Sequence, residues 1–305
     1  MLLISLVGEQ PIPNLLPIRY LKPAEVLLVY TNKTEETAGR LKTLILNEAY
    51  HPEVGILSVA PYHLSSILDL LRDKLRGHED MVYNVTGGTK VMSIAAYMLA
   101  QETQSPIVYF QSEGQTSKLF RYLLKEGEVQ VLSEEICPEQ INIQDFLHAY
   151  LPGYRIDGYH RGTDGNLDSG GQFEKDVDDA LRREGFETLA GVRPTGEGNQ
   201  IEIDLVIRMG NQVGIAEVKL GDEKGEGPKK GIDQLALATQ REYLGTYTSR
   251  FLIVARPQSK EIHELALAHN ISLIEVKNPD YNRDWSKMLI QKIRDKLIPN
   301  ARKRI

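Results

Sequence analysis

The stretch IEIDLVI at residues 201–207, together with VGIAEVK at residues 213–219, decides the fold of the C-terminal half. Apolar residues alternate in both stretches, which is the period of a β-strand, and residues 209–212 between them have the composition of a turn. We therefore predict a hairpin. Side chains two apart share a strand face, so Glu217 and Lys219 lie together, and Asp204 on the partner strand reaches the same place.

Two carboxylates and a lysine in one place suit the cleavage of a phosphodiester. Carboxylate oxygens are ligands for Mg²⁺ or Mn²⁺, and such an ion polarises a phosphoryl oxygen and lowers the pKa of a bound water. Lys219 would orient that water or neutralise the developing charge. A third carboxylate, Glu174, lies on the helix predicted to begin at residues 169–171, beside its apolar stripe. Glu202 shares a face with Asp204, and both a ligand role and a solvated role remain open for it.

The order of these elements resembles the PD-(D/E)xK nuclease superfamily. Asp204 matches the motif aspartate, residues 217–219 match the (D/E)xK element, and Glu174 matches the helical acidic residue. Ile203, rather than Pro, precedes Asp204. A helix predicted from about Ile232 carries a polar residue that some members add. The resemblance implies that Mn²⁺ or Mg²⁺ is held by Asp204, Glu217 and Glu174, and that the catalytic set is Glu174, Asp204, Glu217, Lys219 and Gln234.

The N-terminal half alternates strand-like and helix-like runs. Such βαβ units predict an α/β Rossmann-like domain with a parallel sheet, whose ligands bind beyond the C-terminal ends of the strands. The predicted strands are residues 2–7, 26–30, 54–59, 81–84 and 107–111, and the predicted helices are about residues 35–48, 62–76 and 91–101.

The loop NVTGGTK at residues 84–90 is the most specific feature of this half. Gly87 and Gly88 let backbone amides approach a ligand, and Thr86, Thr89 and Lys90 place hydroxyls and a charge at a helix N-terminus, which together form an anion site. The loop has neither the Walker A pattern nor the G-x-G-x-x-G pattern, which argues against ATP hydrolysis and hydride transfer. A glycine pair that only permits a tight turn is the alternative.

The loop and the βα layout over about residues 1–140 resemble CARF domains, the sensors of CRISPR-associated Rossmann fold proteins. The resemblance implies a homodimer that binds a cyclic oligoadenylate. A CARF domain fused to a PD-(D/E)xK domain is similar to the ancillary nucleases of type III CRISPR systems, in which cyclic tetra-adenylate activates metal-dependent cleavage of DNA, RNA or both. By this resemblance the messenger pocket is lined by Gly8, Glu9, Gln10, Pro11, Thr31, Asn32, Lys33, Thr86, Gly87, Gly88, Thr89 and Lys90.

The length of 305 residues and the 41% hydrophobic content allow two cores. We place a CARF sensor domain at residues 1–143 and a linker plus restriction-endonuclease-like α/β domain at residues 144–305, and we expect residues 142–150 to form a helix that transmits motion. No run approaches the roughly 18 apolar residues of a membrane span. The single cysteine, Cys137, excludes an internal disulfide. We expect a cytoplasmic protein without membrane contact.

The net charge of −6 does not favour strong nucleic-acid binding. Basic residues at 224, 229 and 230 and near the C-terminus either make loose substrate contacts or only solvate the surface. Tyr154, Tyr159 and Arg161 either stack on a substrate base or pack the surface, and the seven histidines have no ligand spacing. Two alternatives remain open: a non-catalytic sensor with a degenerate nuclease fold, and a constitutive restriction or repair endonuclease. Ring size, base preference and degradation of the messenger by the sensor itself are also open.

Overall fold

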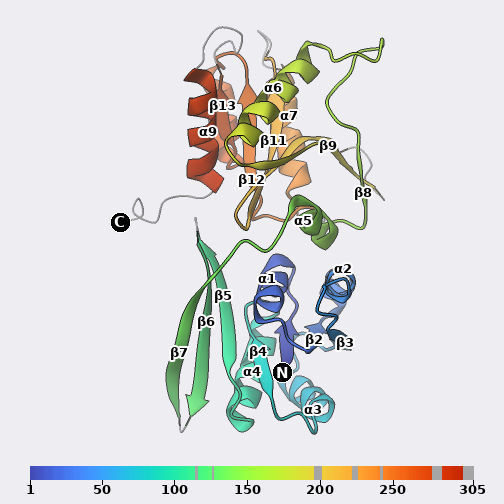
Figure 1. Ribbon diagram of the computed structural model, residues 1–305, viewed down its shortest axis with the longest axis vertical. Coiled ribbons are helices and arrows are strands. Elements are labelled where there is room, and N and C mark those ends of the chain that lie inside the picture. Colours follow the sequence, from blue (N-terminus) through green and yellow to red (C-terminus); the bar gives the residue numbers. More distant parts are fainter. Residues whose placement is uncertain are drawn as a thin grey trace. The chain divides into compact units, whose positions relative to one another are not determined.

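The computed structural model describes residues 1–113, 116–125, 127–195, 201–221, 226–240, 243–276 and 284–297. The chain forms two compact units (Figure 1). The first comprises residues 1–141 and 148–150, and the second comprises residues 142–147 and 151–305. The predicted basic residues Lys224, Arg302, Lys303 and Arg304 lie outside the described residues.

The first unit is built on a sheet in the order β3-β2-β1-β4-β5-β6-β7. Strands β1 to β5 run parallel to one another, as the βαβ pattern predicted, and β6 and β7 add antiparallel strands at one edge. The strands are β1 (Leu2–Leu6), β2 (Glu25–Tyr30), β3 (Glu53–Ser58), β4 (Met81–Asn84), β5 (Ile107–Glu113), β6 (Thr116–Lys125) and β7 (Glu128–Cys137).

Helices cover both faces of this sheet. The helices are α1 (Ile12–Leu21), η1 (Asn32–Thr34), α2 (Glu35–Leu46), α3 (Leu64–Lys74) and α4 (Lys90–Glu102). Helices α3 and α4 pack with one face of β1, β2 and β4 in a core that includes Ile4, Leu71, Tyr83 and Leu99. Helices α1 and α2 contact each other and the strands β1 and β2. The sequence did not predict α1, because Pro13 and Pro17 both fall within it.

The second unit is built on a sheet in the order β13-β12-β11-β10-β9-β8. The predicted hairpin is β10 and β11, which pair antiparallel. Its strands are β8 (Tyr154–Ile156), β9 (Glu187–Pro194), β10 (Ile203–Met209), β11 (Gln212–Lys219), β12 (Ser249–Val254) and β13 (Ser272–Glu275), and its helices are α6 (Ser169–Arg183), α7 (Glu226–Ala238), α8 (Lys260–Ala268) and α9 (Asp284–Leu297).

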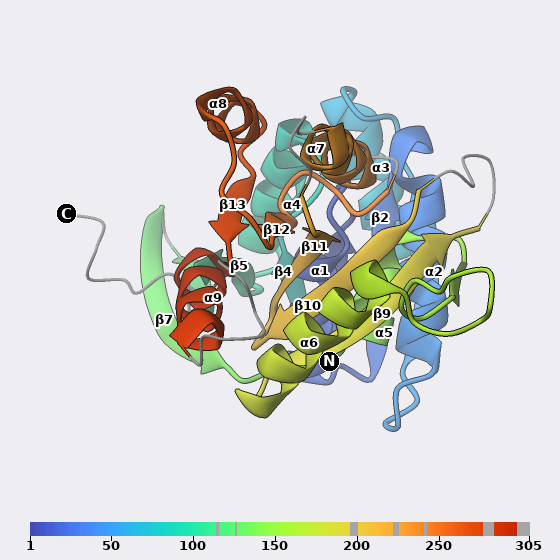
Figure 2. The ribbon, with the colours of Figure 1, turned by 90° about the horizontal axis from the view of Figure 1, so that it is seen from above.

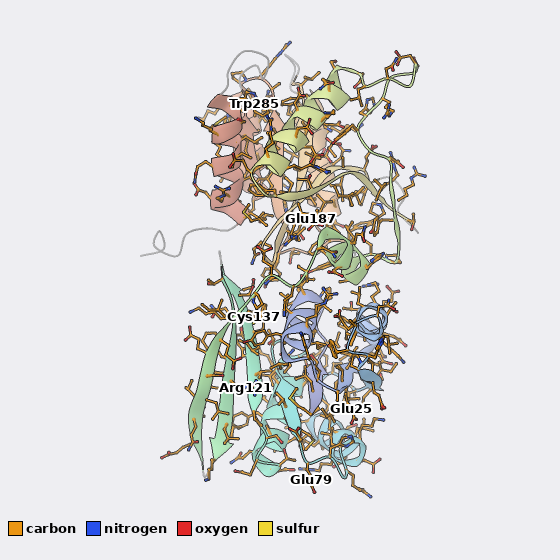
Figure 3. All side chains as sticks on the ribbon, viewed as in Figure 1. Glu25, Glu79, Arg121, Cys137, Glu187 and Trp285 are labelled. Atoms are coloured by element: carbon orange, nitrogen blue, oxygen red, sulfur yellow. The ribbon has the colours of Figure 1, made fainter. Side chains whose placement is uncertain are left out.

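Helices cover both faces of this second sheet (Figure 2). Helices α6 and α9 share a core with β9 to β12 that includes Phe173, Val177, Leu205 and Val218, and Trp285 packs against it (Figure 3). Helix α7 contacts β11 and β12 and also α8. Helix α7 begins at Glu226, earlier than the predicted start near Ile232.

Helix α5 (Ile143–Tyr150) is divided between the two units. Its first residues belong to the second unit, where the N–H of Ile143 donates to Glu187 at 3.0 Å. Its last residues belong to the first unit, where Arg40 donates to the Ala149 carbonyl at 3.0 Å and the Tyr150 hydroxyl donates to Gln10.

Two further features bear on the sequence-based expectations. Cys137 is buried at the end of β7 (Figure 3), and burial raises the pKa of its thiol to about 11, so it stays protonated.

None of the helices in the described residues is both long and apolar enough to cross a membrane.

Candidate functional site

The two strands of the predicted hairpin separate at the end that carries the acidic motif. Pairing runs from Met209 opposite Gln212 to Leu205 opposite Ala216 and stops there. Beyond that point the Asp204 side chain turns toward β11 and accepts a hydrogen bond from the Val218 N–H at 2.8 Å. The gap between the diverging strands is therefore filled by a carboxylate.

Lys219 lies between the two motif carboxylates. Its Nζ atom is 2.8 Å from Asp204 Oδ2 and 2.8 Å from Glu217 Oε2. Asp204 is 8% exposed and Glu217 is 1% exposed. Val218 faces the opposite side, in the core beneath α6 and α9. The alternation of a strand thus places Glu217 and Lys219 on the same face, as the sequence pattern indicated.

Burial and neighbouring charges shift the pKa values of Glu217, Lys219 and Glu174. Burial, followed by the charge of Asp204, raises the pKa of Glu217 well above its ordinary value, against the opposing effect of Lys219. Burial lowers the pKa of Lys219, but the charges of Glu217 and Asp204 outweigh it and the net pKa is raised. Burial and the charge of Asp204 also raise the pKa of Glu174. A cluster of carboxylates with raised pKa values is an environment that favours a bound cation.

Helix α6 brings Glu174 to the same cluster. The helix begins at a cap in which Asp168 Oδ1 accepts from the Gly171 N–H at 2.8 Å. Phe173 and Val177 hold its apolar stripe in the core, and Glu174 beside them is 7% exposed. One oxygen of Glu174 accepts from the backbone N–H of His160 at 2.9 Å. The sequence assigned no role to the histidines, because this contact uses the backbone and leaves no trace in side-chain spacing.

Helix α7 passes directly over β11 at the motif. A Cβ atom on Gly231 would make ordinary contacts with Cβ of Glu217 at 3.5 Å and Cε of Lys219 at 3.8 Å, but it would lie only 2.9 Å from Cδ1 of Leu252 on β12, so the glycine permits the close approach to β12. Gln234 follows three residues later, on the same side of the helix. Its Oε1 atom is buried and accepts no hydrogen bond. Gly231 was missed from the sequence, because a single helical glycine has many explanations.

Other polar residues that the sequence analysis considered have partners elsewhere. Glu202 accepts from Arg193 at 2.5 Å, which favours a structural role for it. Lys229 pairs with Glu261 at 3.0 Å. On α9, Lys296 donates to the Asn270 side chain at 3.1 Å.

The donor set of the cluster suits a divalent cation. Oε2 of Glu217 is buried and accepts no hydrogen bond, so its link to Lys219 is an ion pair without a directed bond. Hard carboxylate oxygens are the ligands that Mg²⁺ and Mn²⁺ prefer. Within the described ranges, the structure shows no group of three Asp, Glu, His or Cys side chains arranged to hold a metal ion. The carboxylates are therefore chemically suitable ligands for a metal ion, and the Lys219 ammonium lies between two of them.

The predicted pocket residues of the first unit follow the carboxyl ends of β1, β2 and β4. A Cβ atom on Gly87 would lie 2.3 Å from the Leu6 carbonyl oxygen, and one on Gly8 would lie 3.1 Å from the Gly88 nitrogen. Gly88 has φ +76°, which only glycine adopts freely. Gly8 and Gly87 therefore allow the backbones of residues 8–11 and of the loop at residues 84–90 to pack closely together.

The two threonine hydroxyls of this loop already have partners. The Thr86 hydroxyl donates to Asn84 Oδ1 at 2.6 Å and accepts from the Phe110 N–H at 2.8 Å. The Thr89 hydroxyl donates to the Pro61 carbonyl at 2.9 Å and caps α4 by accepting from the Met92 N–H. The sequence suggested that these hydroxyls face a ligand. The structure uses them to hold the loop.

A buried polar network missed by sequence reasoning supports the same loop. Asn84 and Asn14 both donate to the Ser5 hydroxyl, at 3.0 and 2.9 Å. Asn84 also donates to the Pro13 carbonyl, which the helix leaves free because Pro17 has no N–H. The Asn84 and Asn14 side chains are fully buried.

The remaining predicted pocket residues line the same edge with different exposure. Lys33, Asn32, Glu9 and Lys90 are exposed. Thr31 and Pro11 are buried, Thr31 in the capping box with Thr34 and Pro11 at the start of α1. Gly8 and Gln10 are half-buried, and Gln10 accepts from Tyr150.

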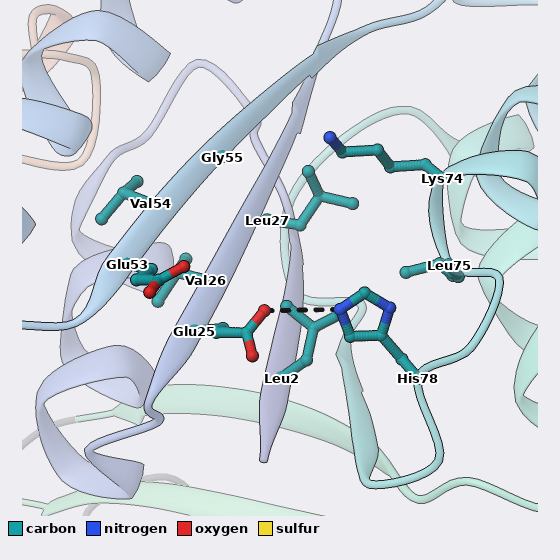
Figure 4. Close-up of a pocket in the computed structure, with 10 residues that line it drawn as sticks. All are labelled: Leu2, Glu25, Val26, Leu27, Glu53, Val54, Gly55, Lys74, Leu75 and His78. Carbon is teal, nitrogen blue, oxygen red and sulfur yellow. Dashed lines mark hydrogen bonds and ion pairs between the residues drawn. The ribbon is translucent and has the colours of Figure 1, made fainter.

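A cavity of about 310 Å³ lies at the opposite ends of these strands (Figure 4). It is lined by the first residues of β1, β2 and β3 and by Lys74, Leu75 and His78. His78 Nε2 lies 3.3 Å from Glu25 Oε2. The cavity is remote from the glycine loop, because the two occupy opposite edges of a parallel sheet.

Known proteins match both the sequence of the first unit and the fold of the whole chain. Residues 2–146 match the family model of the Card1 CARF domain. Can2 from Sulfobacillus thermosulfidooxidans, solved with cyclic tetra-adenylate, is 18% identical with a TM-score of 0.73, and the match covers 97% of this chain and 99% of that chain. Protein VC1899 from Vibrio cholerae is 13% identical with a TM-score of 0.74 and 97% coverage of each chain.

A type III CRISPR defence DNA nuclease activated by cyclic oligoadenylate is also similar, at 17% identity and a TM-score of 0.61. The match covers 95% of this chain and 51% of that chain. No curated protein matches the sequence. Residues 2–146 of this chain are therefore similar to the Card1 CARF domain, and the chain as a whole, including the α/β domain that follows, is similar in fold to Can2.

Proposed function

We propose that this protein is an endonuclease of type III CRISPR antiviral defence that cyclic tetra-adenylate activates and that requires Mn²⁺ or Mg²⁺. The observation that carries the proposal is the pairing of Lys219 with both Asp204 and Glu217, whose buried Oε2 lacks a hydrogen bond, beside Glu174, whose pKa is raised by burial and by the charge of Asp204. Their presence in a chain with a CARF domain supports control by a cyclic oligoadenylate. The similarity in fold to Can2 supports cyclic tetra-adenylate as the messenger.

The proposed catalytic residues divide the work by their position. Asp204, Glu217 and Glu174 would hold the metal ion, which when bound polarises the scissile phosphate and acidifies a water. The Val218 N–H and the Lys219 ammonium both donate to Asp204 and hold its carboxylate in position. The ammonium of Lys219 then neutralises charge on the reacting phosphate, because it lies on the same strand face as Glu217. Gln234 on α7 would contact the attacking water or the substrate through its unpaired carbonyl oxygen.

The proposed messenger site is the carboxyl edge of the first sheet. The exposed side chains of Lys33 and Lys90 would contact phosphates, and the backbone of Gly87 and Gly88 would approach the ring closely. The threonines would act by holding the loop in shape. We propose a homodimer in which one messenger contacts both subunits, since a ring of four equal nucleotides matches two-fold symmetry.

Activation requires that the messenger bind the active state more tightly than the resting state. To move a population from about 1:99 to about 99:1 takes roughly 5.5 kcal/mol of differential binding. A ligand with several phosphates that contacts two subunits provides enough charge-assisted contacts for this difference, because each contributes about 1.5–3 kcal/mol.

The deciding experiment measures cleavage of labelled single-stranded RNA and of supercoiled plasmid, with Mn²⁺ or Mg²⁺, with and without cyclic tetra-adenylate. Cleavage only with both the messenger and the metal is the expected result. Cleavage that needs no messenger would instead identify a constitutive nuclease. If neither substrate is cut under any condition, while the messenger still binds, the protein is a sensor without catalysis.

A further inference from the structure

A short loop before α6, residues 157–162, lies against the carboxylate cluster. Its His160 N–H donates to Glu174 Oε2 at 2.9 Å. The imidazole of the same residue pairs with Asp168, the cap of α6, at 2.8 Å. The loop therefore reaches both the first turn of α6 and the proposed metal ligand on it. No sequence motif assigns a function to this contact.

The loop is anchored by a buried carboxylate on α6, one helical turn after Glu174. The hydroxyl of Tyr159 donates to Asp178, which is fully buried on α6. Asp178 also accepts from Arg182 at 3.0 Å and from the Thr188 hydroxyl. Burial, with the neighbouring charge of Asp178, raises the pKa of Tyr159, so its hydroxyl remains a donor at every physiological pH. Tyr159 thus ties the loop to a rigid network shared by α6 and β9.

Two glycines let the loop backbone approach α6 and β9. A Cβ atom on Gly171 would lie 1.9 Å from the His160 carbonyl oxygen, and one on Gly191 would lie 2.0 Å from the Gly158 carbonyl oxygen. The Asp157 N–H donates to the Gly191 carbonyl at 2.8 Å. Side chains at these two glycines would displace the loop, so its position depends on their absence.

We propose that Tyr159 is a positioning residue of the nuclease centre, which holds the His160 N–H against Glu174 so that Glu174 presents its carboxylate to the divalent ion. The inference rests on the proposed function, because it assumes that Glu174 is a metal ligand. Partners that orient a metal ligand fix its geometry, and their removal typically weakens metal binding by about 10–100-fold.

The first test compares Tyr159→Phe with Tyr247→Phe in the full-length protein. Tyr159→Phe keeps the ring and removes only the anchoring hydroxyl, and the control changes a tyrosine that is 84% exposed in the same unit. Isothermal titration with Mn²⁺, without nucleic acid, measures the metal affinity. Tyr159→Phe is expected to raise the Kd about tenfold or more, and excess Mn²⁺ is expected to restore kcat. Tyr247→Phe is expected to match the wild type.

A second pair tests the same contact without changing Tyr159. Gly171→Ala pushes directly on the His160 carbonyl, whereas a Cβ on the neighbouring Gly170 meets only the Asp168 side chain, at 3.3 Å. Both changes add one methyl group to the first turn of α6. Gly171→Ala is therefore expected to weaken Mn²⁺ binding, as Tyr159→Phe does, and Gly170→Ala is expected to leave it unchanged.

The outcomes separate this inference from the proposed function. If the wild type binds Mn²⁺ and cuts nucleic acid, but Tyr159→Phe and Gly171→Ala bind Mn²⁺ as tightly as it does, the positioning role is wrong and the nuclease remains. Lost activity that excess Mn²⁺ does not restore, at unchanged metal affinity, also contradicts the positioning role. If the wild type neither binds Mn²⁺ nor cuts, both proposals fail together.

Discussion

Nζ of Lys219 lies 2.8 Å from Oε2 of Glu217, a buried oxygen that accepts no hydrogen bond. The ammonium thus occupies a position beside the carboxylates where a cation is favoured. The proposed metal ion and Lys219 must share these carboxylates, so metal binding is expected to shift the lysine toward the substrate. The first two predictions follow from this competition.

Glu217→Gln is expected to abolish cleavage, to leave messenger binding unchanged and to stabilise the metal-free protein at neutral pH. The pKa of Glu217 is raised in the folded state. Below the pKa of about 4.3 that a glutamate has in the unfolded chain, the carboxyl is protonated in both states and the wild type keeps its full stability. The wild type loses stability as the pH rises from there through the folded pKa. The amide does not ionise, and Asp204 still neutralises Lys219. The gain is about 1.4 kcal/mol for each pH unit by which the pKa is raised.

Thermal unfolding in EDTA at a series of pH values measures this gain. The difference in Tm between Glu217→Gln and the wild type should grow with pH and vanish near pH 4. Glu261→Gln, which removes an exposed carboxylate from α8, serves as the control for loss of charge. A variant that is less stable than the wild type at pH 7.5 would contradict the burial argument.

Lys219→Ala is expected to bind Mn²⁺ more tightly and to cleave more slowly. Removing the ammonium frees Asp204 and Glu217 for the ion, so the Kd for Mn²⁺ falls. The reacting phosphate meanwhile loses a positive partner, and removal of one such group typically lowers kcat by roughly 10²–10³. Isothermal titration and single-turnover cleavage measure the two effects, which have opposite signs. Weaker Mn²⁺ binding in this variant would mean that Lys219 organises the ligands and does not compete with the ion.

The sequence predicted the parts of both units that local patterns encode. Alternation in residues 201–219 gave the β10–β11 hairpin, and the βαβ rhythm gave β1 to β5 with α2, α3 and α4. Helix α1 was missed because its stability comes from tertiary contacts that outweigh two prolines, with Asn84 bonding to the carbonyl that Pro17 leaves free. The final α8, β13 and α9 were not assigned.

The proposed catalytic side chains were named from their spacing in the sequence, but spacing does not reveal the environment in which they lie. This environment depends on long-range packing. Packing buries Glu217, opens the gap where β10 and β11 diverge, and brings α7 close at Gly231. The contact between His160 and Glu174 uses a backbone N–H, which any residue carries. In the first unit, the sequence pattern predicts that the hydroxyls of Thr86 and Thr89 contact a ligand. It does not reveal that they donate to Asn84 and to the Pro61 carbonyl.

Lys90→Ala is expected to weaken binding of cyclic tetra-adenylate by about tenfold or more, since a charged contact contributes about 1.5–3 kcal/mol. Lys90 is exposed at the first turn of α4, next to the glycine loop. Cleavage at saturating messenger should remain near the wild-type rate, because the proposed catalytic residues lie in the second unit. Lys74→Ala, in the cavity at the opposite edge of the sheet (Figure 4), is the matched control. Equal loss of affinity in both variants would indicate a general charge effect.

Tyr150→Phe is expected to uncouple messenger binding from cleavage. The Tyr150 hydroxyl at the end of α5 donates to Gln10 in a predicted messenger loop, and the N–H of Ile143 at the start of the same helix donates to Glu187 on β9. Loss of the hydroxyl removes the link to Gln10 while the ring remains in place. Calorimetry should show messenger affinity within about threefold of the wild type, and the messenger concentration that half-activates cleavage should rise by about tenfold, the range of a coupling energy of 1–3 kcal/mol. Tyr62→Phe, an exposed tyrosine of the first unit, is the control. If activation by the messenger is unchanged in Tyr150→Phe, α5 does not carry the signal through this bond.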